Sequence, residues 1–469
     1  MLAAGFTLLL FVCWWFVGYG CLFVLRRGHL LQNMLLAPSV GTAVCVMFVF
    51  WLNRAGIPVS KFGPALGVSL LLGTVILWRR GRVIAPMRRY LPFVAIFLFA
   101  FSLIAWPMFK YGFNWVSISN DDMANYCLTA QRLSEYGYFE RLAPDVLAKN
   151  MDLSAYYIFL ADAGTRTGSE MLLAFVMSLS RLTSHQVFMP VIVALHLSLL
   201  SAAGALFLQN NRLRGWGLMT VFILACSAEM TVGTVYQLIA QVFGLSLLAS
   251  CAVLLMLPSR TVIRSALVKQ SGLLALIFSA AMVVYTEMIP FLAFACLLFW
   301  GRQLLCMREI PGIRAYLIAG LVTIVFLNSY IPAALRFMTS QTRAGSGHFA
   351  SPEGAPVLYP YFLLPSGLAQ FWGISPFNVI PQEPFLSSGI LFGGFLLIVS
   401  VIVSFREAYF GVPVAFVSAG MFGAAAVLAF KESDYGLFKI SMFIQPFLIP
   451  TLVGAWMRFT ENKGWSRLA

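Results

Sequence analysis

Two adjacent carboxylates, Asp121 and Asp122, stand in a polar stretch that follows a long apolar segment. Asn120 precedes them, and Tyr126 follows about one helical turn later. Paired carboxylates at a helix start suit two chemistries, because one can act as general base towards a hydroxyl group or both can coordinate a divalent cation. A structural role is equally open, in which one Asp caps the helix and the other is solvated.

A third acidic candidate is Glu287, which lies between Tyr285 and Pro290 at the end of an apolar segment. An ionisable group at membrane depth is costly, so such a residue is a functional candidate by default. We therefore interpret Glu287 as catalytic, together with Asp121 and Asp122. In the alternative interpretation, Pro290 marks a helix end and the Glu287 side chain is simply exposed there.

Basic side chains that suit a phosphate occur late in the chain. Residues 431–439 hold four charges, and Lys439 opens the last apolar segment, where a cation and helix N-terminal amides can hold a phosphate together. Arg336, Arg343 and His348, in the predicted outer loop 336–385, are expected to add to this anion site. The alternative is an ordinary interfacial loop with a snorkelling lysine. The substrate-binding candidates are Asn120, Tyr126, Arg336, Arg343, His348, Asp434, Tyr435 and Lys439.

The elements that carry these residues follow from composition. The chain has 469 residues, of which 60% are hydrophobic and 10% charged, whereas soluble domains carry about 25% charged residues. This composition excludes a cytosolic enzyme, a secreted domain and a disordered protein. With about 20 residues per crossing, the sequence predicts an all-α polytopic membrane protein with about 13 transmembrane helices. The expected spans are 3–25, 35–52, 63–78, 91–108, 187–208, 216–233, 235–257, 271–289, 290–306, 315–335, 386–405, 411–430 and 438–457.

The charge distribution predicts the orientation of these spans. The net charge is +14, and most basic residues fall in one set of alternate connections, as the positive-inside rule requires of cytoplasmic loops. We therefore expect the C-terminus in the cytoplasm and the N-terminus and the two longest loops outside. The positive charge then serves orientation and anionic lipid headgroups, and nucleic acid is excluded as a partner. The absence of an Asn-x-Ser/Thr sequon favours a bacterial inner membrane.

Two further helices are expected in the first large outer loop, residues 109–186. The first begins at the Asp pair and has one apolar face. The second follows a predicted capping box between Thr167 and Glu170, and it is too short to cross a membrane. We interpret both as interfacial, or the second as re-entrant. The predicted organisation is N-terminal transmembrane helices in 1–90, a catalytic core in 91–335, an outer loop in 336–385 and C-terminal transmembrane helices in 386–469.

Taken in order, four motifs resemble the GT-C superfamily of integral-membrane glycosyltransferases, which use polyprenyl-phosphate-linked sugars as donors. Members usually place the acidic loop directly after their first span, whereas three further spans precede it here. The motifs are Asn120-Asp121-Asp122…Tyr126, the capped helix Thr167–Leu173, Tyr285-x-Glu287-x-x-Pro290 and Asp434-Tyr435-Gly436-x-x-Lys439.

The resemblance implies a GT-C-like fold and an inverting sugar transfer on the periplasmic face. Asp121 or Asp122 would accept the proton of the acceptor hydroxyl, and Lys439, with Arg336 or Arg343, would stabilise the leaving phosphate. A divalent cation (Mg²⁺ or Mn²⁺) held by the Asp pair is compatible with this scheme but not required by it. The implied partners are a polyprenyl-phosphate-linked sugar, a glycan, lipid or protein acceptor, and membrane lipids.

Two other functions remain open at this stage. A flippase or exporter of lipid-linked saccharide is also polytopic, but it should show polar residues spread through its spans, and few are seen. An O-antigen polymerase or ligase relies on Arg and His in a large periplasmic loop, and Arg343 and His348 keep that alternative open. Nucleotide-driven transport lacks support because the sequence has no P-loop.

Overall fold

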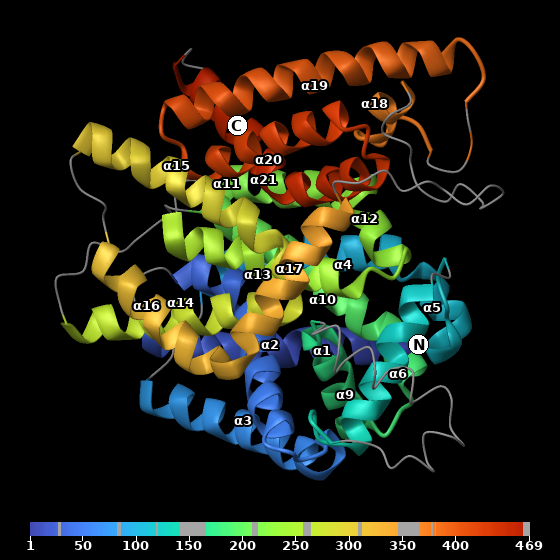
Figure 1. The fold of residues 1–469 in the computed structure, drawn as a ribbon. Helices are drawn as coiled ribbons and strands as arrows, with labels where there is room; N and C mark the ends of the chain where they lie inside the picture. Colours follow the sequence, from blue (N-terminus) through green and yellow to red (C-terminus); the bar gives the residue numbers. More distant parts are fainter. Residues whose placement is uncertain are drawn as a thin grey trace.

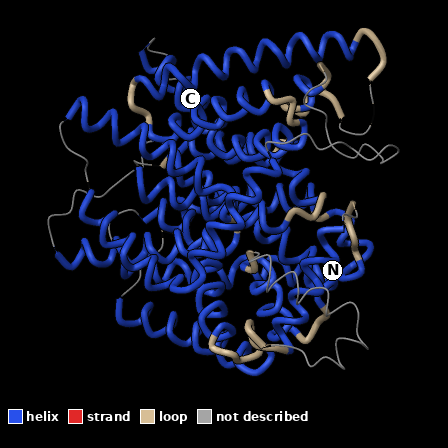
Figure 2. The backbone as a smooth tube through the Cα atoms, in the orientation of Figure 1, coloured by secondary structure: helices blue, strands red, loops and turns tan. Residues whose placement is uncertain are grey.

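The structure is a computed structural model, and the secondary structure in its described ranges is helical, with no strand (Figure 2). The described residues are 1–26, 30–81, 86–118, 121–140, 166–208, 214–256, 264–307, 312–345, 365–376, 379 and 381–462.

Within these ranges, 12 helical segments are long and apolar enough to cross a membrane. A thirteenth is counted if the bent pair α11 and α12, which meet at 53°, forms one broken span. This confirms the prediction of an all-α polytopic membrane protein with about 13 spans. The span helices are α1 (Leu2–Leu25), α2 (Leu30–Arg54), α3 (Val59–Gly81), α4 (Met87–Ile104), α10 (Ser184–Phe207), α11 (Arg214–Ala225), α12 (Ala228–Val235), α13 (Ile239–Met256), α14 (Arg264–Val284), α15 (Ile289–Met307), α16 (Ile313–Leu327) continued by α17 (Ile331–Gly345), α19 (Phe385–Tyr409), α20 (Pro413–Phe430) and α21 (Asp434–Asn462).

Short helices complete the described fold. Among them, α5, α6 and α18 lie in the right-hand half of Figure 1. They are α5 (Trp106–Tyr111), η1 (Gly112–Asn114), α6 (Asp121–Glu135), α9 (Gly168–Ser180), η3 (Thr286–Met288), η4 (Asn328–Tyr330) and α18 (Gly367–Gln370).

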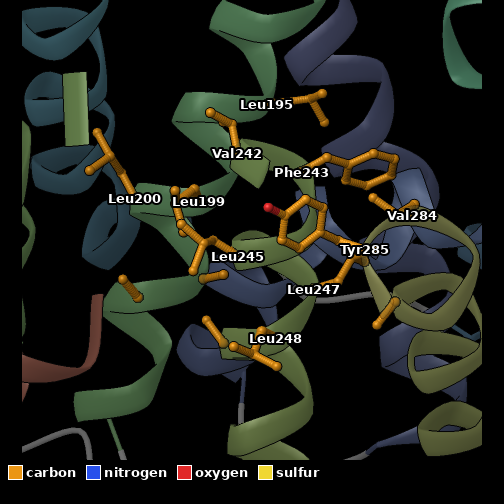
Figure 3. Close-up of a cluster of buried hydrophobic side chains, with 14 of the residues drawn as sticks. Leu195, Leu199, Leu200, Val242, Phe243, Leu245, Leu247, Leu248, Val284 and Tyr285 are labelled. Carbon is orange, nitrogen blue, oxygen red and sulfur yellow. The ribbon is translucent and has the colours of Figure 1, made fainter. Parts of the chain in front are cut away.

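Helices α10 and α13 form the centre of the protein, and their most apolar stretches are completely buried. A helix that is apolar on all faces is expected in such a position. Figure 3 shows leucines of both helices in one buried apolar cluster that also holds Phe243 and Tyr285. Small hydroxyl residues let α2 approach this centre, since Ser39 of α2 hydrogen-bonds Ser198 of α10 and Ser246 of α13.

The outer helices present apolar side chains that the protein does not cover. The most apolar stretch of α19 is only 17% buried. Leu391, Phe395 and Ile398 on this helix are 60% or more exposed. Such a helix surface is stable in contact with lipid tails, and it follows that these helices form the lipid-facing periphery.

One sequence-based boundary is corrected by the structure. The outer loop expected from residue 336 starts later, because α17 continues through Gly345. The second helix expected in the first loop, α9, is packed inside the protein, since its residues from Gly168 to Val176 are buried. It packs against α2, α3, α6 and α10, and this burial is what brings its first turn to the site described next.

Candidate functional site

A cavity of about 660 Å³ lies where α6, α9, α13, α15, α17, α20 and α21 meet. Its lining has a charged part and an apolar part. The charged and polar side chains are Asp122, Asn125, Tyr126, Thr129, Arg166, Glu170, Gln241, Tyr285, Glu287, Gln341, Lys431, Tyr435 and Lys439. The apolar ones are Leu238, Phe291, Phe337, Ala424, Val427, Leu428, Ile440 and Phe443.

Five of the residues that the sequence singled out line this one cavity: Asp122, Tyr126, Glu287, Tyr435 and Lys439. Asp122 and Tyr126 are four positions apart on α6, and Tyr435 and Lys439 are four apart on α21. Side chains at this spacing share one face of a helix. Helices α6 and α21 therefore each place two polar side chains in the cavity lining.

The arginines expected beside Lys439 are not in the cavity. Arg336 and Arg343 are exposed on α17, whereas Phe337 and Gln341 of the same helix line the cavity. Positions 337 and 341 share one helix face, and positions 336 and 343 fall on other faces. The structure therefore does not bring these two arginines into the cavity lining beside Lys439.

Asp434 has a structural role rather than a place in the cavity lining. It is the first residue of α21, and its Oδ1 accepts a hydrogen bond of 2.6 Å from the Tyr435 backbone N–H. Asn120 and His348 lie outside the described residues, as does the side chain of Asp121, which begins α6. Of the acidic pair, Asp122 is thus the carboxylate that the structure describes at the cavity.

Glu287 is paired with a cation that the sequence reasoning missed. The Arg166 guanidinium lies 3.4 Å from the Glu287 carboxylate, and its Cζ is 4.3 Å from the centroid of the Tyr285 ring. Burial opposes the charge on Arg166, but Glu287, Tyr126 and Tyr285 outweigh it, so the pKa of Arg166 lies above its ordinary value. Arg166 is a permanent cation in the cavity wall. Its only sequence signal is its place directly before an apolar helix.

Glu170 does not form the capping box predicted from its spacing to Thr167. Thr167 makes no side-chain capping bond at the start of α9, and the Ser169 hydroxyl instead donates to the Glu170 carboxylate at 2.6 Å. Burial raises the pKa of Glu170 to about 7, although the bond from Ser169 acts in the opposite direction. Glu170 is therefore a carboxyl group that exchanges its proton near neutral pH.

Lys439 brings a second cation to the cavity from α21. Its Nζ donates to the Gln241 side-chain oxygen at 3.2 Å and lies 5.2 Å from the centroid of the Tyr435 ring. An ammonium group has three donors, so the bond to Gln241 leaves capacity for a ligand. The predicted lysine is thus held in place by a glutamine on a different helix.

The divalent cation considered in the sequence analysis would be held by Asp121 and Asp122, and the Asp121 side chain lies outside the described residues. Within the described part of the chain, no three His, Cys, Asp or Glu side chains come close enough together to hold a metal. Glu287 is already paired with Arg166, and Glu170 accepts from Ser169. These two carboxylates thus have partners within the protein, and no step below uses a metal.

The apolar part of the lining comes mainly from α15, α20 and α21. Phe291, Leu428 and Phe443 belong to it, and Val427 of α20 both lines the cavity and is 56% exposed. The charged part of the cavity therefore continues into an apolar wall that reaches the lipid-facing surface.

Comparisons with family models, with curated proteins and with solved structures find no match. The function must therefore be inferred from the chemistry of this cavity.

Proposed function

We propose that this protein is a membrane glycosyltransferase that moves a sugar from a polyprenyl-phosphate donor to an acceptor hydroxyl, with inversion at the anomeric carbon. The observation that carries the proposal is the meeting of Asp122, Lys439 and an apolar wall in one cavity. A lipid-linked sugar needs those three features together: a base, a cation for the phosphate and a surface for an isoprenoid tail.

Asp122 is the general base of the proposed reaction. As the acceptor oxygen attacks the anomeric carbon, its proton passes to the Asp122 carboxylate. The bond between the anomeric carbon and the phosphate oxygen breaks, and its electron pair leaves with polyprenyl phosphate. Attack on the face opposite the leaving group inverts the configuration.

Two cations support departure of the phosphate. Lys439 faces the cavity with donors to spare and stabilises the negative charge that builds on the leaving group. Arg166 adds a fixed positive charge, and Glu287 acts as a positioning residue because its carboxylate holds the guanidinium in place. Phe291 and Phe443 supply apolar surface for the first isoprene units.

The periplasmic face of a bacterial inner membrane is the proposed site of this reaction. The support is the charge alternation of the sequence, which assigns the connection carrying Asp122 to the outside.

The test is sugar transfer by purified protein supplied with a panel of polyprenyl-phosphate monosaccharides, with release of polyprenyl phosphate as the readout. We expect Asp122→Asn to lower turnover by about 10²–10⁴-fold, the usual contribution of a general base. Asp434→Asn is the matched control, because Asp434 accepts a bond from the neighbouring backbone N–H at the start of α21 and does not line the cavity. Folded Asp122→Asn protein with wild-type turnover would refute the proposal. Movement of the lipid-linked sugar across vesicles without its consumption would replace it with the flippase alternative.

A further inference from the structure

A second pocket, of about 330 Å³, surrounds Arg54 at the end of α2. Four aromatic rings hold the guanidinium, with centroids 4.7–5.6 Å from its Cζ. Among the described residues, no carboxylate lies within ion-pair distance of it. Arg54 is thus a cation placed beside a pocket with aromatic rings as its neighbours. The rings belong to Phe50, Tyr138, Phe139 and Tyr330.

The polar groups around this pocket are linked by hydrogen bonds, and they leave donor groups for a ligand. Arg54 Nη2 donates to the Ser329 hydroxyl at 2.9 Å, and that hydroxyl donates to Asn328 Oδ1 at 3.1 Å. The same Oδ1 accepts from the Ser329 backbone N–H at 2.6 Å. These bonds assign the amide of Asn328 so that its NH₂ group is available to a ligand. The pocket thus presents an arginine and an amide donor, a combination that suits an oxyanion.

The helix that ends beside this pocket, α16, carries exposed apolar side chains. Leu317, Leu321, Ile324 and Val325 form a stripe on α16 that is 56–72% exposed, and α16 ends directly before Asn328. Trp51 of the pocket fixes α2 to this region, since its indole N–H donates to the Phe326 carbonyl oxygen at 2.9 Å. A ligand whose phosphate meets Arg54 can therefore lay its hydrocarbon chain along α16.

We propose that this pocket binds the phosphate headgroup of a membrane lipid. Arg54 is the last residue of the candidate membrane span Leu30–Arg54, and lipid phosphates lie at the depth where spans end; Asn328 and Ser329 lie where α16 passes into α17. This site is separate from the proposed donor cavity, because the two share no lining residue, and the inference does not rest on the proposed sugar transfer.

The experiment is native mass spectrometry of the detergent-purified full chain, titrated with phosphatidic acid or with diacylglycerol that carries the same acyl chains. We expect wild-type protein to retain phosphatidic acid more tightly than diacylglycerol. Arg54→Gln and Asn328→Asp should each weaken phosphatidic acid binding about tenfold, as loss of one charge-assisted hydrogen bond implies. Asn328→Asp replaces the donor amide with a carboxylate of the same size, so it tests the site even if Arg54→Gln unfolds the protein.

Lys110→Gln is the matched control. Lys110 is exposed and stacks on the Tyr111 ring at 5.1 Å but lines neither pocket, so its loss should leave binding unchanged. Wild-type affinity in folded Arg54→Gln and Asn328→Asp proteins would overturn the proposal. Competition by glycerol 3-phosphate at the same concentration as phosphatidic acid would also overturn it, because the site would then recognise free phosphates rather than a lipid.

Discussion

Glu170 makes the stability of this protein depend on pH near neutrality, and Glu170→Gln should remove that dependence. Glu170 is 6% exposed on α9, a helix too short to be counted among the spans. The Ser169 hydroxyl donates to its carboxylate, and a glutamine side-chain oxygen can accept the same bond. The substitution therefore removes the ionisation and keeps the local geometry.

The size of the effect follows from the pKa of Glu170, which burial raises from 4.5 to about 7. Between pH 4.5 and about pH 7, the folded protein binds more protons at Glu170 than the unfolded chain does. The contribution of Glu170 to stability is therefore greatest below pH 4.5 and is lost as the pH rises through about 7. At 1.36 kcal/mol per pKa unit, the cost of ionising Glu170 in the fold approaches about 3 kcal/mol above pH 8. Glu170→Gln protein avoids this cost, so its advantage over wild type should grow with pH.

The assay is thermal and denaturant unfolding of purified protein in detergent between pH 5 and 9. The two proteins should have similar stability at pH 5, and the variant should be more stable at pH 8. Glu135→Gln is the matched control, since Glu135 is exposed on α6 and bonds Gln131. Wild-type and Glu170→Gln curves that run parallel over the whole range would refute the reasoning.

Two further predictions concern the ion pair at the cavity and the packing of α1 on α2. Arg166→Met should destabilise the protein by about 3 kcal/mol, because the Glu287 carboxylate, whose side chain is 14% exposed, then loses its cation. A double-mutant cycle with Glu287→Gln, measured by denaturant unfolding, checks this prediction. Additive effects of the two substitutions would contradict it. Gly41→Ala should strongly destabilise the packing of α1 on α2, because a Cβ at Gly41 would overlap the Trp14 backbone carbonyl. Gly73→Ala should be nearly neutral, because a Cβ there meets nothing within 4 Å. Thermal unfolding of both variants tests this prediction, and equal stabilities would contradict it.

The sequence by itself determined the helical membrane architecture. Lipid leaves no water to satisfy backbone N–H and C=O groups, so apolar segments of span length must become helices. The same logic singled out Glu287 and Lys439, since a charge at the end of an apolar segment stands out against its neighbours. Asp122 stood out instead as one of two adjacent carboxylates at a predicted helix start. Those inferences need only local composition, and the structure brings these three residues to one cavity.

Only the tertiary structure decided which polar groups face one another. The pairing of Arg166 with Glu287 joins residues more than a hundred positions apart, and no local pattern encodes it. Neighbouring positions on a helix point about 100° apart, so Phe337 lines the cavity while Arg336 does not. Glu170 matched a capping pattern in sequence, but packing of α9 against neighbouring helices buried its carboxyl group in the cavity wall. Such outcomes depend on helix rotation and on contacts between distant segments, which the order of residues alone does not reveal.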